Sequence, residues 1–233
     1  MSNLHSDYKR LPFYKCERKF ADRKLGIIDT YREIFNRQSV PKDQQYWCVC
    51  AQQCDENNPK REPGSECMQM IDSGLITPEQ WRGVDWEEDL IELNKSVYPE
   101  ISWTYGELRG VMAEAWRNES FNPAIINCDL LTMKKKSCTI VAAIISMLLE
   151  RDITNCMLVM NSVLSTWHHR EAEGNAGGEL QDHIHFLSKD LDFAIALIEK
   201  NWTVFPKAYS YPGTKGSAST MGSIVIYRKE DQC

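Results

Sequence analysis

The sequence predicts an α/β protein whose mostly parallel sheet ends in an antiparallel hairpin. Three observations support this fold class: short apolar segments alternate with helical patterns, polar residues directly follow several of these segments, and the last two segments have no helical pattern between them. Parallel neighbours need a helical crossover and antiparallel ones do not, so the tail predicts a reversed pair. With 233 residues and 42% hydrophobic content, the chain can fill the core of one large domain.

Residues 1–44 differ from the rest in composition, with ten basic side chains against six acidic ones. An apolar pattern of helical period runs from about residue 21 to residue 37, and we expect Pro41 to end the segment. The apolar positions are Leu25, Ile28, Tyr31, Ile34 and Phe35. We therefore expect an N-terminal helical appendage of residues 1–44, packed on a main domain of residues 45–233.

Five units follow in which an apolar strand precedes a helix. The predicted strands are residues 46–50, 82–85, 101–103, 123–128 and 156–160. The predicted helices are residues 65–74, 86–97, 106–117, 136–150 and 179–200. Two further strands, 202–205 and 223–227, form the terminal hairpin, which brings the sheet to seven strands.

Bulk properties exclude several classes of protein. A net charge of −6 and a pI near 5.5 argue against a dedicated nucleic-acid-binding protein. Residues 1–20 have no apolar run typical of a secretory signal, and the apolar stretch 138–149 is too short to span a bilayer. Most of the nine cysteines lie in apolar segments, so we expect reduced, buried thiols in a cytoplasmic protein.

Asp85 is the first candidate for ligand binding. It ends an apolar strand and precedes the acidic start of a helix, so its carboxylate would lie where open α/β sheets bind ligands. There it could accept hydrogen bonds from the two vicinal hydroxyls of a ribose. The alternative is an ordinary solvated helix start, because acidic residues are favoured in a first turn.

Five such units and a closing hairpin resemble the class I S-adenosylmethionine-dependent methyltransferases over about residues 45–230. The resemblance implies a Rossmann-like three-layer α/β sandwich that binds S-adenosylmethionine. Four strand ends carry it: Cys50, Ala51 and Gln52 near the methionine part of the cofactor, Asp85 with Trp86 at the ribose, Gly106 and Glu107 after Tyr105 at the adenine, and Asp129 facing the methyl acceptor.

The first loop departs from the family, which usually has a run of glycines there. This chain has Ala51-Gln52-Gln53-Cys54, and the first glycine after the strand is Gly64. One hypothesis is that the helix start at Gly64, Ser65 and Glu66 offers backbone amides to the carboxylate of the cofactor. The other is that the site is altered and the protein inactive.

The resemblance makes Asp129 and Asn161 the candidate catalytic residues. Asp129 ends the fourth strand and Asn161 the fifth, where they could orient an amine or hydroxyl acceptor. Asp129 could equally cap the next helix. The chain lacks the Asp/Asn-Pro-Pro-Tyr/Phe sequence of amino-group DNA methyltransferases, so methylation of DNA bases at nitrogen is unsupported.

Three other groups of residues could bind a ligand, but each has a simpler structural explanation. His168, His169, His183 and His185 could bind a metal, but an exposed, solvated set is favoured. Cys48, Cys50, Cys54 and Cys67 lack the spacing of a zinc site, and buried thiols are favoured. The Lys134–Lys136 run could contact an anionic partner, although a solvated surface run is more common.

The sequence therefore predicts a methyltransferase-like protein whose acceptor is a small molecule, a protein or RNA. The alternative is a catalytically inactive protein of the same fold that acts as an interaction or regulatory module. A different nucleotide-binding enzyme ranks last, because the chain has neither a Gly-x-Gly-x-x-Gly nor a Gly-Lys-Ser/Thr motif.

Overall fold

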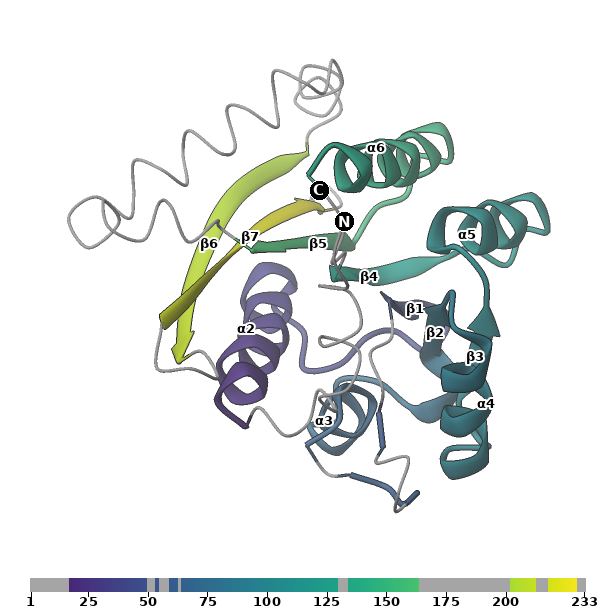
Figure 1. The fold of residues 1–233 in the computed structure, drawn as a ribbon. Helices are drawn as coiled ribbons and strands as arrows, with labels where there is room; N and C mark the ends of the chain where they lie inside the picture. The colour runs from purple at the N-terminus through teal and green to yellow at the C-terminus, as the bar shows by residue number, and fades with distance from the viewer. Residues whose placement is uncertain are drawn as a thin grey trace.

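The computed structural model describes residues 17–49, 53–54, 59–62, 64–129, 134–163, 202–212 and 218–229. A seven-stranded sheet lies at its centre, with helices on both faces (Figure 1). The predicted helix 179–200 lies outside the described residues.

The sheet has the order β3-β2-β1-β4-β5-β7-β6. Its strands are β1 (Gln45–Val49), β2 (Trp81–Asp85), β3 (Ser102–Tyr105), β4 (Pro123–Asp129), β5 (Cys156–Val163), β6 (Thr203–Pro212) and β7 (Ala218–Arg228). All pairings among β1 to β5 are parallel, and β7 is antiparallel to both β5 and β6. The predicted parallel sheet with a reversed terminal hairpin is thus confirmed.

Helices form the two outer layers. One face carries α2 (Glu17–Phe35), α3 (Glu66–Asp72) and α4 (Glu88–Val97), and the other carries α5 (Leu108–Arg117) and α6 (Lys134–Glu150) (Figure 1). The 3-10 turn η2 (Pro78–Gln80) leads into β2. Gly74 ends the α3 region as predicted, because its φ of 69° is a left-handed conformation that glycine adopts without strain.

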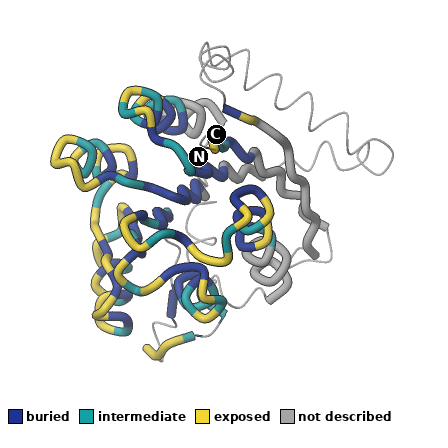
Figure 2. The backbone as a smooth tube through the Cα atoms, turned by 180° about the vertical axis from the view of Figure 1, so that it is seen from behind, coloured by how far each residue is buried: buried dark blue, intermediate teal, exposed yellow. Residues whose placement is uncertain are grey.

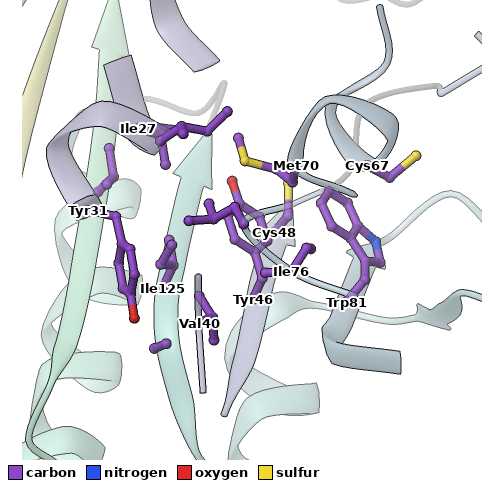
Figure 3. Close-up of a cluster of buried hydrophobic side chains, with 14 of the residues drawn as sticks. Ile27, Tyr31, Val40, Tyr46, Cys48, Cys67, Met70, Ile76, Trp81 and Ile125 are labelled. Carbon is purple, nitrogen blue, oxygen red and sulfur yellow. The ribbon is translucent and has the colours of Figure 1, made fainter. Parts of the chain in front are cut away.

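The first core lies between the sheet and helices α2, α3 and α4. Tyr46 of β1 and Trp81 of β2 stack with ring centroids 5.1 Å apart, and Met70 of α3 is buried in the same cluster (Figure 3). Tyr31 of α2 is also fully buried there. Burying each such side chain contributes about 1.5–3 kcal/mol, so this core holds α2 and α3 on the sheet.

The second core lies between the sheet and helices α5 and α6. Its fully buried members include Met112 of α5, Ile144 and Leu148 of α6, Ile126 of β4 and Leu158 of β5. Dark segments in Figure 2 mark buried residues along the central strands. The two cores together explain why β1 and β4 are apolar on both sides, as parallel central strands must be.

Helix α2 is where the predicted appendage meets the sheet. Five of its apolar side chains are buried, at Ile27, Ile28, Tyr31, Ile34 and Phe35. Its Arg32 Nη2 donates a 2.7 Å hydrogen bond to the carbonyl of Ser73, just after α3. The helix therefore shares a core with the main domain, and the boundary at residue 44 remains a prediction.

Three sequence-level questions concern the described part of the chain. No helix in it is long and apolar enough to cross a membrane. Five cysteines whose side chains are described there are buried, namely Cys48, Cys54, Cys67, Cys128 and Cys156. Within the same residues, no group of three or more His, Cys, Asp and Glu side chains could hold a metal ion. His168, His169, His183, His185 and Cys50 lie outside the described residues.

Candidate functional site

The carboxyl ends of the five parallel strands meet at one edge of the sheet. Asp85 at the end of β2 is the register partner of Tyr105 at the end of β3. Asp129 at the end of β4 is the partner of Asn161 in β5. The chain crosses from β3 to β4 on the other side of β1, so strand order reverses beside β1. Open α/β sheets bind ligands at such a switch point, outside the carboxyl ends of the strands.

Asp85 connects the two turns at this edge. Its Oδ1 accepts a 2.9 Å hydrogen bond from the backbone N–H of Glu87, which shapes the turn into α4. Its carbonyl oxygen accepts a 2.8 Å hydrogen bond from the N–H of Gly106, in the turn into α5. The side chain is held in one place and is only 7% exposed, at the surface end of a buried strand.

Two exposed aromatic residues adjoin Asp85, one in the chain and one across the sheet. Among the residues whose exposure is described, the large hydrophobic side chains classed as exposed are Trp86, at 64%, and Tyr105, at 56%. Trp86 follows Asp85 in sequence, and Tyr105 is its neighbour across the sheet. Exposed aromatic rings beside a strand-end carboxylate provide apolar faces on which a planar ring can stack.

Gly106, directly after Tyr105, has a backbone conformation that residues with a side chain rarely adopt. Its φ is 150°, and a Cβ at this position would lie 2.8 Å from Cγ2 of Val111 in α5. Glycine is therefore required here by both backbone and space. Glu107, the next predicted residue, is exposed at the start of α5, with its Oε2 3.8 Å from a guanidinium nitrogen of Arg109.

Glu66 lies inside the protein rather than at its surface. Its Oε1 accepts hydrogen bonds from Tyr46 Oη at 2.7 Å, Asn127 Nδ2 at 2.7 Å and Cys48 Sγ at 3.2 Å. The carboxylate thus joins the first turn of α3 to β1 and β4. The sequence did not point to Tyr46 or Asn127 as partners of Glu66. A polar residue within an apolar strand, as Asn127 is, was nevertheless a sign of a buried hydrogen bond.

Two polar side chains after β1, those of Gln53 and Ser65, accept hydrogen bonds from backbone amides of α3. Gln53 is 1% exposed, and its Oε1 accepts a 3.3 Å hydrogen bond from the N–H of Cys67. Ser65 caps α3 and its Oγ accepts a 3.4 Å hydrogen bond from the N–H of Met68. The chain itself therefore uses these two first-turn amides of α3. The predicted residues Cys50, Ala51 and Gln52 lie outside the described residues.

Asp129, the last residue of β4, is the register partner of Asn161 as expected, but Asn161 does not end its strand, because β5 continues to Val163. They lie on the far side of β1 from Asp85, so the switch point separates the two halves of the candidate site.

Known proteins were compared with the chain at the level of sequence and of structure. No protein-family model matches the sequence, and no curated protein matches it. Among solved structures, the N-methyltransferase NodS from Bradyrhizobium japonicum WM9 is similar with a TM-score of 0.50, at 11% identity over 94% of this chain and 100% of that chain.

The chain has the fold of class I methyltransferases. A SAM-dependent methyltransferase from Methanosarcina mazei is also similar, with a TM-score of 0.48 and 10% identity over 88% of this chain and 98% of that one. An O-methyltransferase from Bacillus cereus in complex with SAH has a TM-score of 0.44 and 12% identity, covering 89% of this chain and 90% of that chain.

The predicted resemblance is therefore confirmed for the fold. In this methyltransferase fold, the strand ends that the sequence singled out occupy one edge, with Asp85 on the β2 side and Asp129 on the β4 side. The roles of the individual residues at that edge remain predictions.

Proposed function

We propose that the protein binds S-adenosylmethionine and transfers its methyl group to an acceptor. The observation that carries this proposal is the arrangement at the end of β2, where Asp85 is followed in sequence by the exposed Trp86 and is the register partner of the exposed Tyr105. A nucleoside offers a matching pair of groups, namely vicinal ribose hydroxyls and a flat, polarisable base.

The residues present fit the nucleoside part of this cofactor. A carboxylate accepts hydrogen bonds from two neighbouring hydroxyls, and the Asp85 side chain is already oriented by the N–H of Glu87. Trp86 and Tyr105 offer stacking surfaces, and Gly106 allows the backbone turn that follows Tyr105. We propose these residues, with Glu107, as the nucleoside-binding group.

On the other side of β1, we propose that Asp129 and Asn161 hold the acceptor. When bound, S-adenosylmethionine supplies an electrophilic methyl group for in-line displacement. The contribution of the chain is then to align the acceptor and to accept its proton. A carboxylate at Asp129 suits an amine or hydroxyl acceptor, because it accepts a hydrogen bond from either.

Calorimetric titration with S-adenosylmethionine and S-adenosylhomocysteine tests the proposal. We expect both to bind the wild-type protein and Asp85→Ala to weaken binding tenfold or more, since a hydrogen bond to a charged group contributes about 1.5–3 kcal/mol. Asp89→Ala, which removes an exposed carboxylate from the first turn of α4, is the matched control.

Two results would count against this function. Absence of heat with either ligand at high micromolar concentration would reject cofactor binding and favour the inactive interaction module. Equal weakening by Asp85→Ala and Asp89→Ala would reject Asp85 as the ribose ligand. If binding is confirmed, Asp129→Asn is expected to keep cofactor affinity and to lose methyl transfer.

A further inference from the structure

Tyr98 joins two points of the segment that follows β1. Its hydroxyl donates a 3.1 Å hydrogen bond to the carbonyl of Gln53 and accepts a 2.9 Å hydrogen bond from the N–H of Glu62. One side chain thereby bridges backbone groups on either side of an eight-residue span, in the loop where the proposed function places the first contacts of the cofactor. We call this pair of hydrogen bonds the Tyr98 latch.

The phenol ring of Tyr98 is itself fixed. Tyr98 follows α4 directly, and its backbone N–H donates a 2.9 Å hydrogen bond to the carbonyl of Asn94. Trp103 Nε1 donates a 3.1 Å hydrogen bond to its carbonyl, and the two rings lie 6.1 Å apart. The guanidinium of Arg61 lies 5.6 Å from the ring centroid. The hydroxyl therefore has a defined position, which a freely rotating side chain would not have.

Asn94 provides a second attachment to the same helix. It is fully buried, and its Oδ1 accepts a 3.2 Å hydrogen bond from the N–H of Gln53. Both backbone groups of Gln53 are therefore held from α4 and its C-terminus, and its side chain is held by the N–H of Cys67. Three hydrogen bonds therefore fix Gln53.

These contacts bear on the missing glycines. A glycine-rich turn can approach a ligand because its backbone adopts conformations closed to other residues. This chain has no glycine from residue 50 to residue 63, and hydrogen bonds from the Tyr98 side chain hold the backbone at Gln53 and Glu62 instead. Breaking them would leave buried backbone groups without partners, which is costly and would loosen the loop.

We propose that Tyr98 is a positioning residue that holds Gln53 and Glu62 in the positions that cofactor binding requires. This inference rests on the proposed function and concerns the methionine end of the same site. Tyr98 acts through Gln53 and Glu62 rather than by touching the cofactor.

Tyr98→Phe tests the latch because it removes only the hydroxyl. Tyr31→Phe is the matched control, since Tyr31 is a fully buried tyrosine of the same core that lies in α2 and not at the end of α4. We expect hydrogen exchange at the Glu62 amide to speed up about tenfold in Tyr98→Phe and to stay unchanged in Tyr31→Phe. Exchange in the strands is expected to be unchanged in both variants.

The second measurement is affinity for S-adenosylhomocysteine by calorimetry. We expect Tyr98→Phe to raise Kd about tenfold and Tyr31→Phe to leave it unchanged. Asn94→Ala, which removes the second attachment, is expected to act in the same direction and keeps the test available should Tyr98→Phe not fold.

The outcomes separate this inference from the proposed function. If the wild-type protein does not bind S-adenosylhomocysteine, the proposed function is wrong. The role of Tyr98 in cofactor binding is then wrong as well, even if hydrogen exchange shows that the Tyr98 latch exists. If the wild type binds and Tyr98→Phe binds equally well, the inference alone is wrong. Tighter binding by Tyr98→Phe would also overturn it, because the latched segment would then obstruct the site.

Discussion

The carboxylate of Glu66 and the side-chain amide of Asn127 are joined by a 2.7 Å hydrogen bond within the buried core. Glu66 begins α3 and Asn127 lies in β4, so the bond links the two sides of the switch point. It also explains a polar residue in the middle of a central strand, where an unpaired amide would be costly.

We expect Glu66→Ala to destabilise the fold strongly. The substitution leaves the donors of Asn127 and Tyr46 buried without their acceptor, at about 1–3 kcal/mol for each. Urea unfolding followed by circular dichroism measures the loss. Glu92→Ala, at an exposed position of α4, is the control and is expected to change stability by less than about 0.5 kcal/mol. Similar effects of the two substitutions would mean that the buried network does not stabilise the protein.

Gly106→Ala is expected to lower stability by about 1–3 kcal/mol, because it combines a disallowed backbone angle with a 2.8 Å contact to Val111. Gly110→Ala in α5 is the matched control, since a Cβ there meets nothing within 4 Å. We expect that control to stabilise the helix by roughly 0.5–1 kcal/mol. Thermal unfolding of both variants distinguishes a local constraint from a general intolerance of alanine.

Trp86→Ala is expected to weaken S-adenosylhomocysteine binding about three- to tenfold, the effect of losing one stacked ring of about 0.5–1.5 kcal/mol. Because Trp86 is 64% exposed, unfolding stability should hardly change. Trp86→Phe keeps an aromatic face and should retain most of the affinity. If Trp86→Ala binds S-adenosylhomocysteine as tightly as the wild type does, Trp86 does not belong to the binding site.

Stability is expected to fall at alkaline pH. Burial raises the pKa of both Tyr31 and Tyr98 from about 10 to about 12. The folded protein thus favours the neutral phenols, and their contribution is complete below pH 10 and is lost as pH rises from about 10 to about 12. Urea unfolding at several pH values measures this loss, and Tyr98→Phe should flatten the dependence. A flat wild-type profile across that window would contradict the expectation.

The order of elements was predictable because local patterns report it. Strands β1 to β5 and the helices between them follow from apolar runs and their periods, and the lack of a helix before β7 predicts its reversed direction. The lengths of the last strands were not predictable in this way. β6 extends to Pro212 and β7 starts at Ala218, since their polar halves are paired by backbone hydrogen bonds that need no apolar pattern.

The sequence by itself determined the strand that ends at Asp85 and the alternation of strands and helices around it. Only the tertiary structure showed why a glycine follows Tyr105. Only the tertiary structure decided what Glu66 and Tyr98 do. The hydrogen bond from Asn127 to Glu66 spans 61 residues, and the one from Tyr98 to Gln53 spans 45. Contacts at such separations leave no periodic trace in the chain, because they depend on how packed helices and strands happen to meet.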